Sequence, residues 1–298
     1  MNSRNPDITD PCATSRKAQD TLITRTYQER PNSPCLNRIG RFIKDAKSVV
    51  WSTTTFDKDQ DPLDLLNSII YKVHGFLNTI WLFLDNSIDT EMGFLLYEND
   101  GMPTASSSYI NFAPYAADGK SRITSINREQ LREIRKFHRE HVIPETFGMY
   151  PVTKVVKDET RITRALYFVL AARGSTDLGI KIMHYCTALE TLFSTSQAEL
   201  AHQLSERIAH FSESKPDKRI ETYRMMKKAY TLRSKITHGS AFPAKDFDDL
   251  LNLSVACDDL LRRSFKRMSS DHDMAKMFGI EARLDDYFIE LIFGLQNT

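Results

Sequence analysis

The sequence predicts a mainly α-helical protein, in which a small α+β N-terminal region precedes a C-terminal helical bundle. From about residue 160 onward, the strong apolar periodicities are helical and the connections between them are short. Patterns typical of strands occur only before residue 150. We therefore expect an irregular leader at 1–36, the α+β region at 37–150 and the bundle at 151–298.

The leader and the N-terminal region differ in composition. Residues 1–36 are rich in Asn, Asp, Ser, Thr, Arg and Pro, with little apolar periodicity, which is typical of irregular chain. Pro62 is expected in the first turn of an apolar helix that ends near Leu84. Asn127 and Gln130 form a capping-box pattern for a helix that ends near Val142. Short strands are predicted at 47–56, 93–97 and 107–112.

The bundle is predicted to contain a series of helices separated by breaks rich in Gly, Pro and Ser. Pro144, Gly148 and Pro151 mark its start. Ser214 with Asp217 is expected to cap the fourth helix, and Gly239 is a candidate for the cap at its C-terminal end. The predicted helices are 160–173, 177–194, 197–212, 215–238, 244–269 and 280–294.

The composition is that of a soluble globular protein, with 298 residues, 41% of them hydrophobic, and a net charge of +1. This balance excludes a generally cationic, histone-like protein but permits local basic patches. No apolar stretch is long enough to span a bilayer, and the first residues lack the apolar core of a signal peptide. The four cysteines have neither disulfide nor zinc spacing. We therefore expect a cytoplasmic protein without a metal or cofactor.

Arg233 and His238 stand near the predicted end of the fourth bundle helix. A guanidinium can hold a phosphate through several donors, and an imidazole can transfer a proton near neutral pH. Together these groups suit RNA cleavage, in which a 2′-hydroxyl loses its proton while negative charge builds on the phosphate. On an ideal helix the two side chains point about 140° apart. Unwinding of the last turn at Gly239, or a site shared by two protomers, could bring them together.

Three charged residues fall on or beside the apolar faces of consecutive helices: Glu190, Arg207 and Arg233. A buried charge is costly unless it is paired, so this pattern predicts a partly buried ionic cluster. The cluster could be a structural ion-pair network that fixes the register of the bundle. It could also be a scaffold that orients Arg233 toward a substrate phosphate. Charge spacing alone favours the structural interpretation.

Two segments carry local positive charge. Residues 215–239 hold eight Lys or Arg against two acidic residues, and residues 120–141 hold seven against three. Such segments on a nearly neutral protein are typical of nucleic-acid binding, but solvated helix faces also carry such charge. The candidate RNA-binding residues are Arg224, Lys227, Lys228 and Lys235.

Three blocks of the sequence resemble the Apea-like branch of the HEPN superfamily: Tyr185–Phe193, Leu204–Ala209 and Tyr230–Gly239. The resemblance covers roughly residues 160–270 and depends on the order and spacing of the blocks. It implies a helical bundle that dimerises and cuts RNA without a metal, through an Arg-x4-6-His motif contributed by both protomers. By position, Arg233 and His238 match the catalytic pair, and Glu190 and Arg207 match recurrent polar positions that support it.

The resemblance therefore implies a metal-independent endoribonuclease that acts as a defence or toxin effector, and a homodimer with RNA as its partner. One departure is Ser234, because many HEPN nucleases carry Asn, Asp or His after the motif arginine. The alternative is a non-catalytic HEPN module that binds RNA, a nucleotide or a regulatory protein partner. A metal site built on His138 and His141 is disfavoured, since no cysteine or second histidine pair accompanies them.

Overall fold

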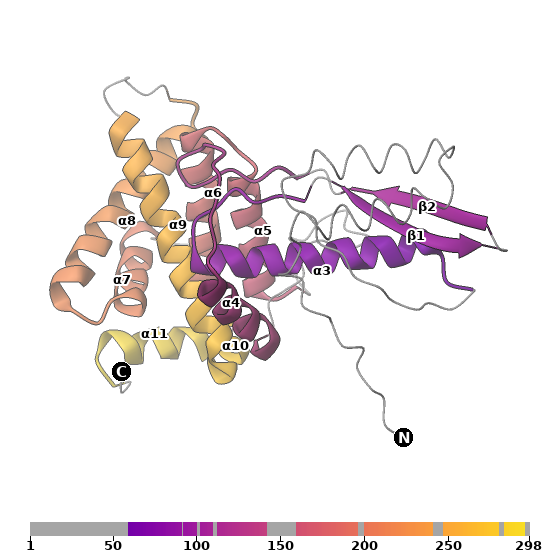
Figure 1. The fold of residues 1–298 in the computed structure, drawn as a ribbon. Coiled ribbons are helices and arrows are strands. Elements are labelled where there is room, and N and C mark those ends of the chain that lie inside the picture. Colours follow the sequence, from indigo (N-terminus) through magenta and orange to yellow (C-terminus); the bar gives the residue numbers. More distant parts are fainter. Residues whose placement is uncertain are drawn as a thin grey trace. The chain divides into compact units, whose positions relative to one another are not determined.

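The structure is a computed structural model, and it describes residues 59–90, 92–99, 102–109, 112–141, 159–195, 200–240, 247–279 and 283–295. Within these ranges the chain forms nine helices and one two-stranded sheet (Figure 1), so the predicted mainly α fold is confirmed. None of these helices combines the length and the apolar character that crossing a bilayer requires. The predicted leader at 1–36, the strand at 47–56 and the boundary near residue 150 lie outside the described residues.

The chain divides into two compact units. Of the described residues, the smaller unit contains 59–70, 92–99 and 102–109, and the larger contains 71–90 and everything from 112 onward. Helix α3 (Pro62–Phe83) contributes its first turns to the smaller unit and the rest to the larger one. Residues 112–141, which we expected in a separate N-terminal region, belong to the same unit as the bundle.

The smaller unit pairs a β-hairpin with the beginning of α3. Strands β1 (Gly93–Asn99) and β2 (Met102–Ser108) are antiparallel. The Ser108 hydroxyl donates to Asn67 of α3 at 2.6 Å. A Cβ on Gly93 would lie 2.9 Å from the Ile70 side chain, so a larger residue there would require Ile70 to shift. The second strand begins five residues earlier than the predicted 107, because pairing with β1 satisfies the backbone of its Ser-rich sequence.

Helix α6 lies at the centre of the bundle in the larger unit, because it packs against four other helices. Its side chains Ile182, Tyr185, Leu189 and Leu192 are fully buried. Burial on several sides explains why its apolar residues surround most of the helix rather than forming one narrow stripe. The bundle helices are α5 (Arg161–Arg173), α6 (Leu178–Phe193), α7 (Leu200–Ser212), α8 (Pro216–Thr237) and α9 (Phe247–Ser270).

Two short helices, α10 (His272–Gly279) and α11 (Leu284–Ile292), close one end of the bundle. Phe278 and Phe288 are fully buried. Phe278 packs edge-on against Phe193 and Phe211, and Phe288 packs against Phe193 at a tilt, with ring centroids 5.1–6.1 Å apart within this group. Aromatic pairs in such arrangements stabilise a core beyond their buried area. The sequence did not predict α10, since its polar first turn resembles a loop.

The ends of α8 test two predicted caps. The predicted Ser214 cap is wrong: the N-cap is Lys215, without a side-chain cap, and Pro216 occupies the first turn. Proline is tolerated there because its missing N–H would have no helical partner. At the other end, Gly239 has a φ of 69°, and its N–H donates to Ile236 at 2.9 Å. The Ser240 N–H donates to Lys235 at 2.9 Å, which completes a Schellman motif and confirms the predicted glycine cap.

Helix α4 (Arg128–Glu140) packs against α3 and carries the predicted capping box at Asn127 and Gln130. Its apolar side contains Ile134 and Phe137, which are buried. Phe137 meets Phe83 of α3 edge-on at 5.4 Å between ring centroids. This packing fixes which side of α4 faces outward.

Candidate functional site

Arg233 and Glu190 form the ion pair that their positions on apolar helix faces predicted. Arg233 Nη2, on α8, donates to Glu190 Oε2, on α6, at 3.1 Å. The Arg233 side chain is 32% exposed and the Glu190 side chain 15% exposed, so the pair lies at the surface of the core rather than inside it. Solvent can therefore reach the guanidinium.

The hydrogen bonding of this pair is incomplete. Glu190 Oε1 and Arg233 Nε are both buried, and neither has a hydrogen-bond partner among the described residues by distance and angle. Burial raises the pKa of the Glu190 carboxyl, while the charge of Arg233 and the nearby Tyr230 hydroxyl oppose that shift. A buried polar atom that lacks a partner costs free energy, so the fold satisfies this pair incompletely. Among the described residues, Arg233 donates to Glu190 alone, which leaves guanidinium donors for a ligand.

Arg207, the third predicted member of the cluster, is bound elsewhere. It donates to the Phe193 carbonyl at 3.1 Å and to the Thr195 hydroxyl at 2.7 Å, and it pairs with Asp285 of α11. Its guanidinium also lies over the Phe288 ring, 4.9 Å from the centroid. The structure therefore brings Glu190 and Arg233 together and assigns Arg207 to the end of α6.

Arg207 follows a rule that the buried cations of the described residues share: each donates to a main-chain carbonyl. Arg161 and Arg207 bind carbonyls at the C-terminal end of α6, Lys181 binds one at the end of α5, and Arg173 binds the Asn86 carbonyl. Cations suit these positions because the last carbonyls of a helix have no helical partner and carry partial negative charge. Arg233 differs, since its partner is a carboxylate and no backbone group requires it.

His238 is the C-terminal cap residue of α8 and is exposed. Its N–H donates to the Ser234 carbonyl at 3.1 Å, so the helix is regular up to this residue. The left-handed backbone begins at Gly239, after the histidine, and does not turn His238 toward Arg233. Because Arg233 contacts α6 and the ideal separation is about 140°, the two side chains do not share a face of α8. Unwinding at Gly239 therefore does not join the two side chains, and a site shared by two protomers stays a prediction.

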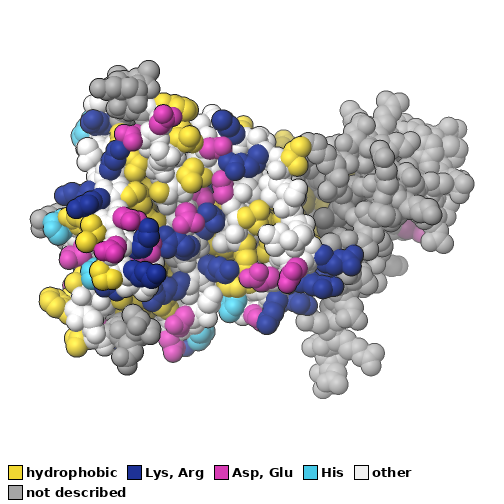
Figure 2. Space-filling view, turned by 60° about the vertical axis from the view of Figure 1, so that its left-hand side comes forward, with side chains coloured by type: hydrophobic (Ala, Val, Ile, Leu, Met, Phe, Trp, Pro, Cys, Tyr) yellow, Lys and Arg dark blue, Asp and Glu magenta, His cyan; other side chains and the backbone are white. Residues whose placement is uncertain are grey.

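The predicted RNA-binding cations of α8 are exposed. Lys228 pairs with Asp249 of α9 at 2.7 Å, whereas Arg224, Lys227 and Lys235 form no ion pair with another described residue. Figure 2 shows Lys and Arg side chains in several groups, with acidic and hydrophobic side chains between them. The face drawn there is therefore not one continuous cationic surface.

A second cluster of charge, the Asp258 network, was not predicted. Asp258 of α9 is 1% exposed and accepts hydrogen bonds from Trp81 at 2.9 Å, Tyr185 at 3.1 Å and Arg262 at 2.8 Å. Burial and the neighbouring carboxylate raise the pKa of Tyr185 well above its usual value. Burial lowers the pKa of Lys181, one helical turn before Tyr185, to about 8. The only hint in the sequence was that Asp258 lies within the apolar pattern of its helix.

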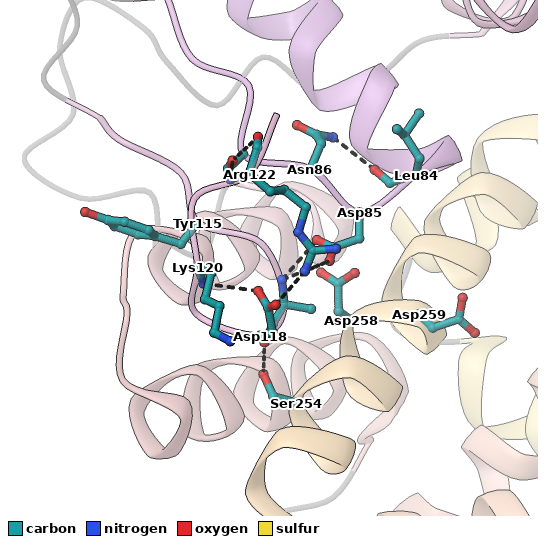
Figure 3. A network of polar contacts seen from close by, with 12 residues as sticks. Leu84, Asp85, Asn86, Tyr115, Asp118, Lys120, Arg122, Ser254, Asp258 and Asp259 are labelled. Atoms are coloured by element: carbon teal, nitrogen blue, oxygen red, sulfur yellow. Dashed lines mark hydrogen bonds and ion pairs between the residues drawn. The ribbon is translucent and has the colours of Figure 1, made fainter. Parts of the chain in front are cut away.

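The network continues into the loop between β2 and α4 (Figure 3). The Ala117 N–H donates to Asp85 at 3.0 Å, and Ser254 of α9 donates to the Ala117 carbonyl at 2.6 Å. Arg122 lies 3.6 Å from Asp85 and 2.8 Å from Asp118. These contacts hold the loop against α9 beside Asp258, so they have a structural role in the fold.

The disfavoured metal site receives no support from the geometry. His138 Nδ1 shares a 2.7 Å hydrogen bond with the Thr79 hydroxyl, and its ring packs edge-on against Phe76. Over the described ranges, no group of three His, Cys, Asp or Glu side chains could hold a metal ion.

Comparison of the chain with protein-family models, curated proteins and solved structures finds no match. The HEPN resemblance therefore depends on its three sequence blocks, and the geometry of Arg233 and Glu190 stands beside it as an independent observation.

Proposed function

We propose that the protein is a metal-independent endoribonuclease of HEPN type that acts in the cytoplasm as an anti-phage defence or toxin effector. The observation that carries this proposal is the state of Arg233: a partly exposed guanidinium, bound by one carboxylate and not required by any helix end. The resemblance of the surrounding blocks supplies the family and the biological role.

In the proposed reaction, His238 removes the proton of a ribose 2′-hydroxyl, and the oxygen attacks the neighbouring phosphorus. The bond to the 5′-oxygen breaks, and that oxygen takes up a proton. The products are a 2′,3′-cyclic phosphate and a 5′-hydroxyl. General base catalysis of this kind contributes on the order of 10²–10⁴ to the rate. Arg233 stabilises the charge on the phosphate, and losing one such preorganised donor costs on the order of 10²–10³.

The proposal requires a homodimer, because Arg233 and His238 of one chain lie on different faces of α8. Each site takes its guanidinium from one copy and its imidazole from the other. Glu190 is then a positioning residue, because its carboxylate fixes the guanidinium before RNA binds. The charges of Arg224, Lys227 and Lys235 attract the RNA backbone to the outer face of the same helix.

The test uses purified protein, tRNA and total RNA in the presence of EDTA, with Arg233→Ala and His238→Ala variants as controls. We expect the parent to cleave RNA, each variant to lose at least about a hundredfold in rate, and DNA to resist. A mixture of the two variants should recover part of the activity, since a mixed dimer keeps one complete pair. Cleavage by His238→Ala at the parental rate would refute the mechanism.

The second candidate is a non-catalytic HEPN module that binds RNA, a nucleotide or a regulatory protein. The observation that favours it is the Glu190–Arg233 ion pair, which also stabilises the packing of α6 on α8 without any substrate. This candidate predicts RNA binding without cleavage and no recovery of activity on mixing the variants. A cleaving parent with inactive single variants would exclude it.

A further inference from the structure

Helix α4 presents a second cationic surface that the proposed site does not use. Its four arginines stand at the spacing i, i+4, i+7 and i+11: Arg128, Arg132, Arg135 and Arg139. On a helix this spacing places them within about 60° of one another, along about 16 Å of the axis. The glutamates of α4 fall on a neighbouring strip, outside this row. We call these four residues the arginine stripe.

The fold does not require the three exposed members of the arginine stripe. Helix α4 is anchored through its opposite side, where Ile134 and Phe137 are buried and Phe137 packs on Phe83. Arg128, Arg132 and Arg139 are exposed and form no ion pair with another described residue, whereas Arg135 is half-buried. Lysine forms helices about as well as arginine, so helix propensity does not explain four arginines in one row.

We propose that the arginine stripe of α4 is a docking site for the phosphate backbone of RNA, separate from Arg233 and His238. Arginine binds phosphate oxygens bidentately, and a row of guanidiniums without intervening carboxylates is complementary to a chain of phosphates. A membrane surface fits less well, because the apolar side of α4 is buried in the protein and cannot enter lipid. The choice of RNA as the polyanion follows from the proposed function.

The position of α4 makes the docking site distant from the basic face of α8. Asp249, near the start of α9, pairs with Lys228 of α8. Lys266, near the other end of α9, lies 3.6 Å from the Phe83 ring centroid and 3.9 Å from Glu133 of α4. These two contacts are separated by about 25 Å along α9. An RNA that contacts both basic surfaces must span a distance of about this order, so the arginine stripe favours extended or large RNAs over short oligonucleotides.

The test measures binding of a labelled single-stranded RNA by fluorescence anisotropy, at several salt concentrations and in the His238→Ala background, where cleavage cannot interfere. The test variant is Arg128→Gln/Arg132→Gln/Arg139→Gln. The control is Lys72→Gln/Lys218→Gln/Lys276→Gln, which removes the same charge from scattered exposed sites. Glutamine retains helix propensity, and thermal unfolding verifies that both variants fold.

We expect the arginine variant to weaken RNA binding about tenfold or more, and to lower the slope of log affinity against log salt by about 2, since each lost phosphate contact removes about 0.7. The control should change both quantities much less, and Arg→Lys changes at the same positions should retain the slope. In the catalytically intact chain, KM for a long RNA should rise while cleavage of a short oligonucleotide is unchanged. Equal losses in the test and control variants would overturn the proposal. Binding of anionic vesicles in place of RNA would also overturn it, in favour of a membrane surface.

A chain that binds RNA through the arginine stripe but never cleaves it would refute the proposed function and leave this inference standing. A chain that cleaves RNA with unchanged KM after loss of the stripe would do the reverse. The two proposals can therefore fail separately.

Discussion

The Asp258 network and the Glu190–Arg233 pair both place a carboxylate beside a cation in the same bundle. They differ in how exposed the charged groups are and in how completely their hydrogen bonds are formed. Asp258 is 1% exposed and holds donors from three other side chains. Glu190 and Arg233 are 15% and 32% exposed, and each has a buried polar atom without a partner among the described residues. The comparison separates a carboxylate that the fold has fully satisfied from an ion pair that it has satisfied only in part.

The largest expected effect is the loss of stability when the Asp258 network is broken. Asp258→Ala should lower the free energy of unfolding by about 3–5 kcal/mol, since it leaves buried donors and a cation without their acceptor. Urea unfolding followed by circular dichroism measures this loss. Asp259→Ala on the next position is the matched control, because Asp259 is 44% exposed and its removal leaves Arg262 still paired with Asp258. If both variants unfolded at the same urea concentration, the Asp258 network would not be structural.

Lys181 should make stability depend on pH. Burial lowers its pKa in the folded protein to about 8, from the ordinary lysine value of 10.5, so between these pH values the unfolded chain binds more protons than the folded one. Stability should therefore rise as pH increases through this window, by roughly 1–3 kcal/mol in total. Lys181→Met, which has a similar volume and cannot titrate, should lack this rise. If the free energies of unfolding of the two proteins changed in parallel from pH 7 to 10, the lowered pKa of Lys181 would be contradicted.

Glu190→Gln tests whether the open pair serves catalysis. The amide keeps the shape of the side chain and one acceptor, so the free energy of unfolding should fall by only about 1 kcal/mol. The guanidinium loses the charge that positions it, and we expect kcat for RNA cleavage to drop roughly tenfold with KM little changed. A large loss of stability with normal kcat would show that Glu190 has a structural role, as Asp258 does.

The smallest effect is expected at the surface pair of α8 and α9. Breaking it with Lys228→Gln should change the free energy of unfolding by less than about 1 kcal/mol, because both side chains are half exposed. Differential scanning calorimetry at low and high salt measures the change. A clear destabilisation that persists in high salt would show that the exposure of an ion pair does not predict how much it stabilises this fold.

Local signals predicted the helices well and their tertiary partners poorly. The periodicity of the bundle helices and the caps at Asn127 and Gly239 depend on neighbouring residues, and the structure bears them out. The Ser214 cap failed because Pro216 started the helix one residue later. The Glu190–Arg233 pair could be predicted from the sequence, since each charge lies at an apolar face of a helix whose length and periodicity were also predicted.

The rest needed contacts between residues far apart in the sequence. Asp258 bonds to Trp81, 177 positions away, and no periodicity within α9 identifies that partner. Arg207 was expected beside Glu190, but the end of α6 and Asp285 of α11 bind it. A charge on an apolar helix face therefore predicts that a partner exists, and only the fold decides which partner it is.

Gly239 ends α8 directly after His238. Its φ of 69° is left-handed, and a Cβ built there would meet nothing within 4 Å, so a side chain at this position would meet no steric obstacle. The penalty for Gly239→Ala would be conformational alone, about 1 kcal/mol. Relief of that strain would open the Ser240-to-Lys235 hydrogen bond that closes the last turn of α8. The helix would then fray from this end, while its first turns kept their packing.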